Sequence, residues 1–211
     1  MNGSLVNQLI KEDYLKSQPV IDAFKKIKRA DFVPDEIVRE KGEDFVADYN
    51  APLSIGYGQT ISQPLTVAFM LELLQTKKGD KILDVGSGSG WQTAMLCQIV
   101  GSEGFVYTIE RISELKEFGQ NNVEKYNFKN VEFICGDGSK GLPERAPFDK
   151  IIAAASVAEE IPQAWKNQLK IKGRLITPVK GSIWLLIKKE KDKFEEKEYP
   201  GFVFVPLISE Q

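Results

Sequence analysis

Residues 81–100 read KILDVGSGSGWQTAMLCQIV and place three glycines between a predicted strand, Lys81–Val85, and a predicted helix, Gln92–Val100. Glycines permit a tight turn and let the backbone approach a ligand closely. The helix that follows offers unpaired N–H groups at its N-terminus. This stretch therefore predicts a strand–loop–helix unit that binds a ligand. The candidate contacts are Gly86, Ser87, Gly88 and Gly90.

The next predicted strand, FVYTI (Phe105–Ile109), is followed by an acidic residue. Glu110 lies about twenty residues after Gly90, where the carboxylate of a nucleotide-binding βα unit accepts hydrogen bonds from two ribose hydroxyls. A tight turn and an exposed acid would give the same pattern without a ligand. The strand–loop–helix context favours a nucleoside site with Glu110 at the ribose.

The spacing of the glycines indicates which nucleoside to expect. A dinucleotide site uses G-x-G-x-x-G, whereas this loop reads G-x-G-x-G after Asp84, and the chain has no G-x-x-x-x-G-K-[ST] phosphate loop. A carboxylate that enters the loop suits a cationic ligand, such as the amino acid end of S-adenosyl-L-methionine, better than a pyrophosphate. Asp84 is therefore a further candidate contact to this cofactor.

A third candidate site follows the strand Val131–Cys135, where the chain reads Gly136, Asp137, Gly138. The carboxyl ends of parallel strands form the edge at which α/β sheets bind ligands. Asp137 is positioned to accept a hydrogen bond from an adenine amino group, with Gly138 beside it. An Asp-Gly turn without a ligand remains an alternative interpretation of this pair.

Beyond the glycine loop, runs of β-forming residues alternate with helical patterns, which is typical of a mostly parallel sheet. Together they predict an α/β fold with a doubly wound, Rossmann-like sheet of seven strands, the layout of class I methyltransferases. The charged run KKEKDKFEEKE is expected to connect the last two strands as a solvated hairpin. The predicted strands are Lys81–Val85, Phe105–Ile109, Val131–Cys135, Asp149–Ala155, Arg174–Val179, Ile183–Lys189 and Phe202–Leu207. The predicted helices are Gln92–Val100, Ser113–Tyr126 and Ile161–Leu169.

The first fifty residues lack β alternation and predict a helical cap over the sheet. We expect one domain over residues 1–211, with residues 1–62 as the cap and a substrate loop. Residues 63–211 then form the cofactor-binding core and the C-terminal strands. The loop passes through Thr60, Ile61 and Ser62 into a helix that begins near Pro64, a residue suited to a first helical turn.

The overall composition excludes several classes of protein. Lys and Arg total 28 against 30 Asp and Glu, a net charge of -2, so the chain lacks the basic excess that nucleic acid binding requires. No apolar run approaches the ~18 residues of a membrane span, and charged residues interrupt the N-terminus where a signal peptide needs apolar ones. We expect a cytoplasmic protein that binds neither nucleic acid nor membrane, and a monomer.

The chain contains no histidine and two cysteines, Cys97 and Cys135. The missing imidazole excludes Ser-His-Asp and Cys-His catalysis, and two cysteines alone cannot supply a thiolate metal site. Both cysteines lie in or beside apolar runs, which favours buried small side chains in a reducing compartment. We expect no metal site.

Six stretches taken together resemble the protein-L-isoaspartate (D-aspartate) O-methyltransferase family, over about residues 29–207. The glycine loop and the GDG triplet are shared with many class I methyltransferases, whereas GQTISQP, APFD and FVPL at these separations are more specific. The stretches are IGYGQTISQP, LDVGSGSGWQTA, YTIER, NVEFICGDGSKGLPERAPFDKI, IPQAWKNQLKIKGRLITPV and FVFVPL.

The resemblance implies roles for two further segments. The loop with Thr60, Ile61 and Ser62 lies over the cofactor and contacts the substrate carboxylate in that family, and the residue matching Ser62 is treated as its active-site residue. The resemblance makes Ser62 and Thr60 the candidate catalytic residues. From the residues alone, either hydroxyl could instead cap the helix at Pro64. The implied substrate contacts are Gly58, Gln59, Ile61, Val205, Pro206 and Leu207.

This chain departs from the family pattern at two places. After the fifth predicted strand it reads Pro178, Val179, Lys180 and only then Gly181, and Ser182–Trp184 replaces a stretch that often contains Gln. Trp91 follows the glycine loop where Tyr is frequent. The first departure puts polar contacts at that end of the site in doubt.

A carboxylate acceptor fits a protein without histidine. A carboxyl group with a pKa near ~4 is already ionised at neutral pH, so it needs no base before it attacks a sulfonium methyl group. The resemblance implies methylation of L-isoaspartyl carboxylates in damaged proteins and peptides, which is a repair reaction, with S-adenosyl-L-methionine as the cofactor. A methyltransferase acting on a small molecule or RNA is the alternative, and a protein that only binds the nucleoside is a third hypothesis.

Overall fold

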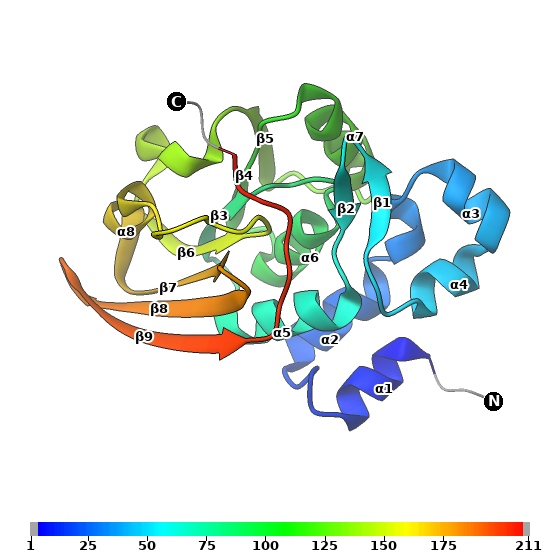
Figure 1. Ribbon diagram of the computed structural model, residues 1–211, viewed down its shortest axis with the longest axis horizontal. Helices are drawn as coiled ribbons and strands as arrows, with labels where there is room; N and C mark the ends of the chain where they lie inside the picture. The colour runs from blue at the N-terminus through cyan, green and yellow to red at the C-terminus, as the bar shows by residue number, and fades with distance from the viewer. Residues whose placement is uncertain (1–3, 209–211) are drawn as a thin grey trace.

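The computed structural model describes residues 4–208, and its centre is a sheet of seven strands in the order β5-β4-β3-β6-β7-β8-β9 (Figure 1). The first five strands of the chain in this sheet are parallel, and β8 and β9 continue it as antiparallel neighbours. This arrangement confirms the predicted α/β fold. The strands are β3 (Lys81–Val85), β4 (Phe105–Glu110), β5 (Val131–Cys135), β6 (Phe148–Ala153), β7 (Leu169–Val179), β8 (Ser182–Glu190) and β9 (Lys193–Pro200).

Apolar residues on alternate positions of the strands divide the core between the two faces of the sheet. Ile82 packs with the first apolar cluster, which includes the helices α5 (Pro64–Leu74), α6 (Trp91–Val100) and α7 (Ser113–Glu124). Its neighbour Leu83 packs with the second cluster, which contains Trp165 of α8 (Gln163–Gln168). Helices therefore cover both faces, as in a doubly wound fold.

The N-terminal residues form the expected helical cap, which packs on α6 through α2. Phe24 of α2 meets Trp91 of α6 edge to face, with ring centroids 5.6 Å apart. The cap and α6 share one apolar cluster, so the cap packs directly on the helix that follows the glycine loop. The single domain over residues 1–211 stays a prediction. The cap consists of α1 (Leu5–Lys11), α2 (Gln18–Lys26), the 3-10 turn η1 (Arg29–Phe32), α3 (Asp35–Lys41) and α4 (Glu43–Asp48).

The prediction for the last strand is wrong. The seventh strand is β9, formed by the charged run, whereas residues 202–207 are extended but outside the sheet. A run of charges is compatible with a strand here because β9 lies at the edge of the sheet and most of its residues face solvent. Residues 201–208 cross from β9 to the loop after β6, where Ser156 donates to the Val205 carbonyl at 2.7 Å (Figure 1).

The loop before α5 also contains structure that the sequence did not predict. β1 (Leu53–Gly56) and β2 (Gln59–Ile61) pair as a small antiparallel hairpin separate from the main sheet. Gly56, Tyr57 and Gly58 all have positive φ at its turn, with values of 88°, 54° and 70°. Two glycines of the IGYG stretch therefore supply the left-handed backbone that this tight connection needs.

A buried arginine joins the cap to this hairpin and to the start of α5. Arg29 is 4% exposed, and its guanidinium donates to the carbonyls of Val46 (3.2 Å), Tyr49 (2.6 Å), Ala51 (2.7 Å) and Ser62 (3.2 Å). Burial lowers the pKa of Arg29 to about 10, so the side chain remains charged at neutral pH. Within residues 4–208 no carboxylate forms an ion pair with it. The charge is compensated by these carbonyl dipoles and by the ring of Trp91, whose centroid lies 5.6 Å from the guanidinium carbon.

We predict that Arg29→Met lowers the free energy of unfolding by about 3 kcal/mol or more, because several carbonyls lose a charged donor. Urea denaturation followed by circular dichroism measures the change. The matched control is Arg39→Met, since Arg39 contacts Glu36 with its side chain 72% exposed and should change stability by less than about 0.5 kcal/mol. Equal losses in the two variants would contradict the structural role given to Arg29.

Candidate active site

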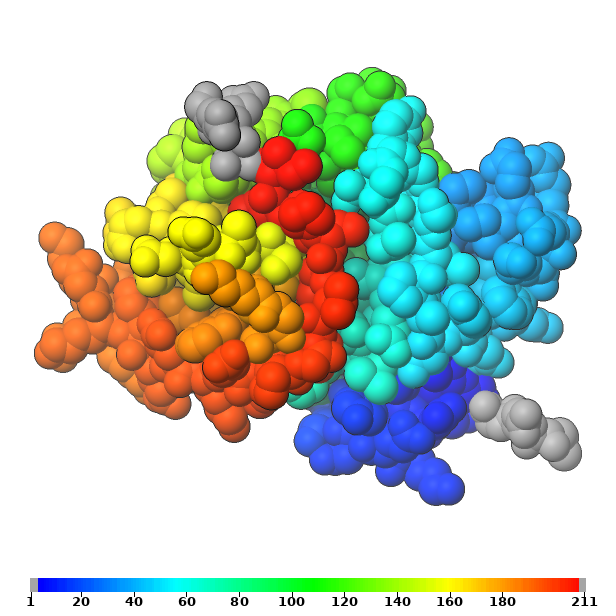
Figure 2. Space-filling model, viewed as in Figure 1, coloured from blue at the N-terminus to red at the C-terminus, as the bar shows by residue number. Residues whose placement is uncertain are grey.

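One cavity lies at the carboxyl ends of β3, β4 and β6, between the β1–β2 hairpin and residues 205–208. It measures about 880 Å³ including the part open to solvent, a size typical of pockets for small organic ligands. Figure 2 shows the C-terminal segment (red) beside the hairpin region (cyan) on this face. The predicted site residues that line the cavity are Gln59, Thr60, Ile61, Ser62, Gly86, Ser87, Gly88, Glu110, Gly138, Val205, Pro206 and Leu207.

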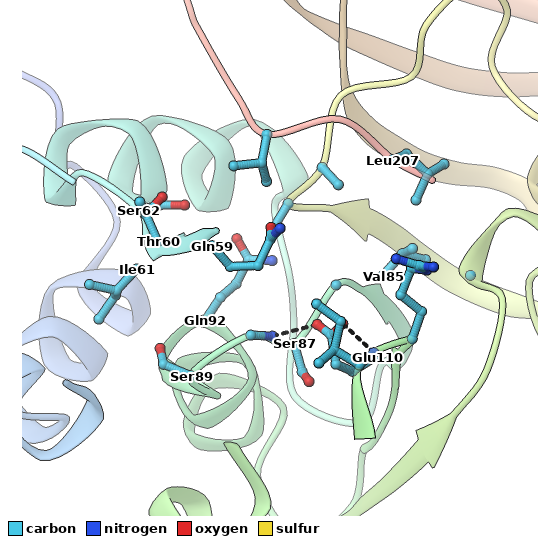
Figure 3. A pocket seen from close by; sticks show the side chains of 18 of the residues that line it. Gln59, Thr60, Ile61, Ser62, Val85, Ser87, Ser89, Gln92, Glu110 and Leu207 are labelled. Atoms are coloured by element: carbon cyan, nitrogen blue, oxygen red, sulfur yellow. Dashed lines mark hydrogen bonds between the residues drawn. The ribbon is translucent and has the colours of Figure 1, made fainter. Parts of the chain in front are cut away.

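Figure 3 shows how these residues approach the cavity from different elements. Thr60 and Ser62 come from the hairpin side, and Leu207 comes from the C-terminal segment across the cavity. Ser87 and Glu110 lie at the base of this view. Four other predicted residues, Gly58, Asp84, Gly90 and Asp137, are not among those that line the cavity.

The glycines of the loop serve two different purposes. Gly86 and Gly88 line the cavity with φ of 86° and 50°, a backbone conformation that L side chains rarely adopt. Gly90 also has a positive φ, 86°, but does not line the cavity; it permits close packing, because a Cβ there would lie 2.6 Å from the carbonyl oxygen of Gly119 in α7. Gly138 is constrained in the same way by Val85, whose Cγ1 would lie 2.5 Å from an added Cβ.

The Glu110 carboxylate is fixed by two backbone N–H groups at the edge of the cavity. Gly88 donates to Oε2 at 3.0 Å and Ile112 donates to Oε1 at 3.1 Å (Figure 3). A carboxylate oxygen can accept more than one hydrogen bond, so each oxygen of Glu110 can accept a further one from a ligand. The arrangement fits the ribose contact expected from the sequence.

Ser87 adds a polar group that lacks a protein partner. Its side-chain hydroxyl is buried in the cavity wall, and no atom of the described chain forms a hydrogen bond with it. Buried hydroxyls are ordinarily paired, so this one is suited to a bound molecule. An unpaired hydroxyl, an oriented carboxylate and glycine backbone are together compatible with a nucleoside cofactor.

The structure places Asp84 beneath the glycine loop rather than in the cavity. Its side chain is fully buried and accepts from Gln92 Nε2 at 2.8 Å, Thr93 Oγ1 at 2.7 Å and Thr108 Oγ1 at 3.4 Å. Burial raises the pKa of Asp84 to about 6, although the three hydrogen bonds oppose the shift. The Asp84 side chain therefore does not line the cavity, because it turns toward Gln92 and Thr93 of α6.

Asp137 has a local partner in the turn that follows β5. Its Oδ1 accepts from the Ser139 N–H at 2.9 Å and so caps the 3-10 turn η2 (Gly138–Lys140), while Oδ2 lies 3.7 Å from Lys140 Nζ. The Asp-Gly turn considered as an alternative is thus present. A contact from Asp137 to adenine stays a prediction.

The hairpin presents hydroxyls that the adjacent helix does not use. The N-cap of α5 is Gln63, and neither Ser62 nor Thr60 caps the helix. Asn50 performs that function, because its Oδ1 accepts from the Leu65 N–H at 3.1 Å. The Ser62 hydroxyl lines the cavity without a hydrogen bond to any residue between 4 and 208. The capping alternative for these two residues is therefore wrong.

Gln92 was not predicted from the sequence, although it lines the cavity from the first turn of α6. The available signal was its position just after the glycine loop, where helix side chains adjoin a ligand bound at the helix N-terminus. Arg111 and Ile112, which follow Glu110, and Ala154 and Ala155, which follow β6, also line the cavity and were missed. They lie at the carboxyl ends of parallel strands, where ligand contacts are expected.

The chain is similar to proteins of one family along its whole length. The model of the Protein-L-isoaspartate(D-aspartate) O-methyltransferase family matches residues 1–211. A protein-L-isoaspartate O-methyltransferase from Pyrococcus horikoshii is 45% identical over 211 residues, covering 97% of this chain and 91% of the relative. The enzyme of the same name from Ignicoccus hospitalis is 42% identical over 212 residues, covering 98% of this chain and 97% of the relative.

Solved structures agree with this likeness. A protein-L-isoaspartate O-methyltransferase structure superposes with a TM-score of 0.83 at 29% identity, covering 96% of this chain and 64% of that one. A putative protein-L-isoaspartate O-methyltransferase from Plasmodium falciparum, solved in complex with S-adenosyl-L-homocysteine, gives a TM-score of 0.79 at 22% identity. That pair covers 97% of this chain and 96% of the other and supports the fold.

We predict that Glu110→Ala weakens binding of S-adenosyl-L-homocysteine, the demethylated form of the cofactor expected from the sequence, by about 10- to 150-fold. The physical reason is the loss of a charged acceptor worth about 1.5–3 kcal/mol. Isothermal titration calorimetry measures the affinity. Glu114→Ala is the control, since Glu114 is exposed on α7 outside the cavity lining. A folded Glu110→Ala variant with unchanged affinity would remove Glu110 from the site.

Proposed function

This chain belongs to the protein-L-isoaspartate(D-aspartate) O-methyltransferase family, and we propose how its cavity performs the reaction of that family. The activity is transfer of a methyl group to the carboxylate of L-isoaspartyl residues in damaged proteins and peptides. The observation that carries the proposal is the meeting of the glycine loop, Glu110 and Ser62 around one cavity in a chain whose full length matches the family.

The cofactor is S-adenosyl-L-methionine, which supplies an electrophilic methyl carbon. We assign its ribose to Glu110, whose carboxylate is already oriented by Gly88 and Ile112. The Ser87 hydroxyl supplies a further polar contact, and Gly138 borders the nucleoside on the β5 side. Asp137 and Gly90 then act by shaping the turn and the helix packing beside the cofactor.

The acceptor carboxylate is assigned to the hairpin side of the cavity. A carboxylate is ionised at neutral pH, so it requires orientation and exclusion of water rather than a general base. The free Ser62 hydroxyl is a hydrogen-bond donor suited to one carboxylate oxygen, and Thr60 and Gln59 lie beside it in the same wall. Residues 205–207 form the opposite wall, next to which the substrate backbone extends.

The partner of this site is a protein or peptide that contains isoaspartate. None of the helices in residues 4–208 has the length and apolar character needed to cross a membrane. The monomeric state, the cytoplasmic location and the lack of nucleic acid binding stay predictions from the sequence.

We predict that an isoaspartyl peptide is methylated and that its normal aspartyl twin is not. The two peptides have equal charge and composition, so discrimination depends on the position of the carboxylate relative to the peptide chain. Transfer of a labelled methyl group to each peptide measures the preference. Equal transfer to both, or transfer only to an RNA or metabolite, would exclude the isoaspartyl function. Cofactor binding without transfer to any acceptor would favour a binding protein.

We also predict that Ser62→Ala lowers the single-turnover rate by at least about tenfold and leaves the affinity for S-adenosyl-L-homocysteine within about twofold. A hydrogen bond to the acceptor carboxylate is worth about 1.5–3 kcal/mol, and the hydroxyl caps no helix, so stability should be unchanged. The matched control is Ser54→Ala, an exposed serine of the same hairpin outside the cavity lining. An unchanged rate in Ser62→Ala would remove Ser62 from the reaction.

A further inference from the structure

Gln92 is the polar side chain of α6 that links the cavity to a buried charge. It lies in the first turn of the helix and lines the cavity. Its Nε2 donates to Asp84 Oδ1 at 2.8 Å, and Asp84 is fully buried. In Figure 3 the side chain of Gln92 rises from α6 toward Gln59 on the hairpin.

The hydrogen bond to Asp84 determines which end of the Gln92 amide faces the cavity. With a pKa of about 6, the Asp84 carboxyl is mostly ionised at neutral pH. An ionised carboxylate only accepts hydrogen bonds, so the amide must turn its NH₂ group toward Asp84. The carbonyl Oε1 is then the end left for other contacts, and nothing in the described part of the chain donates to it.

Asp84 holds this orientation firmly because it is itself held by other side chains. Thr93 Oγ1 donates to Oδ2 at 2.7 Å, and Thr108 Oγ1 lies 3.4 Å from the same oxygen. Oδ1 is thereby left for Gln92. The negative charge behind the amide also polarises it and strengthens Oε1 as an acceptor. The cavity thus contains a fixed oxygen acceptor backed by a carboxylate.

The order of the strands indicates which part of the cofactor meets Gln92. The proposed ribose contact is at the end of β4, and Gly138 follows β5 at one edge of the sheet. A cofactor with its nucleoside over β4 and β5 extends its amino acid end toward β3 and β6, the next strands in the order. Gln92 lies just after the β3 loop, so it adjoins that end.

We propose that Gln92 Oε1 accepts a hydrogen bond from the α-ammonium group of the cofactor, in the orientation that Asp84 fixes. The inference rests on the proposed function, since it assumes S-adenosyl-L-methionine in this cavity. It replaces the direct Asp84 contact expected from the sequence with an indirect one. A carbonyl oxygen backed by a negative charge is well suited to a cation with three N–H donors.

The test compares ligands that differ only at the amino acid end. Gln92→Met removes the acceptor and nearly preserves the size of the side chain. We expect its affinity for S-adenosyl-L-homocysteine to fall by about tenfold or more, as measured by calorimetry. Affinity for 5′-methylthioadenosine, which lacks the amino acid end, should stay within about twofold. The analogue of S-adenosyl-L-homocysteine without its α-amino group should likewise bind the unaltered protein and Gln92→Met with equal affinity.

Gln98→Met is the matched control on the same helix, because Gln98 accepts from Lys26 Nζ at 2.7 Å and is not part of the cavity lining. It should bind all three ligands like the unaltered protein. An unchanged affinity of Gln92→Met for S-adenosyl-L-homocysteine, or equal losses for all three ligands, would overturn the proposal. If the unaltered protein bound none of the three ligands, both the proposed function and the role given to Gln92 would be contradicted.

Discussion

The buried Arg29 side chain connects the parts of the molecule on which the site depends. Its guanidinium donates hydrogen bonds to carbonyls at the end of α4, in the segment 49–51 that follows, and at Ser62. The last carbonyls of a helix have no partner within the helix and carry partial negative charge. The C-terminal end of α4 therefore places partial negative charge next to the guanidinium. A planar guanidinium can meet several such acceptors at once, which an ammonium cannot do with the same geometry. The backbone of Ser62 is therefore positioned by the helical cap.

Close backbone packing gives the opposite side of the cavity its shape. A Cβ on Gly119 would lie 2.7 Å from the Gly88 carbonyl oxygen, so α7 approaches the glycine loop backbone to backbone. Gly138 packs equally tightly on Val85. Glu110 then joins the loop after β3 to the start of α7 through its bonds with Gly88 and Ile112. These contacts allow the cofactor side to be rigid before any ligand binds, whereas the hairpin and residues 201–208 supply the substrate side.

The fold was predictable where local sequence dominates, and less so where tertiary contacts decide. The parallel strands β3–β7 and the glycine loop follow from runs of β-forming residues and from glycine spacing. β9 was missed because an edge strand tolerates charges that argue against a buried strand. The buried structural role of Arg29 could not be predicted from the sequence, since charged residues are ordinarily exposed and its carbonyl acceptors lie up to 33 residues away along the chain. Asp84 was identified as important, but only the structure shows that it reaches the cavity through Gln92.

The Ser62 hydroxyl is free to bind a substrate because contacts with the N-terminal helical cap fix the segment around it. A serine just before a proline-initiated helix ordinarily has two competing uses, as a cap or as a group free to bind a ligand. Here Asn50 caps α5, and Gln63 Nε2 donates to the Asn50 carbonyl at 2.9 Å and holds it in place. Asn50 lies between Tyr49 and Ala51, the two residues whose carbonyls Arg29 binds at 2.6 and 2.7 Å. Arg29 therefore fixes both the segment of Asn50, which caps α5, and the backbone of Ser62, whose hydroxyl stays free. The N-terminal helical cap, to which Arg29 belongs, thus contributes to the site without lining it.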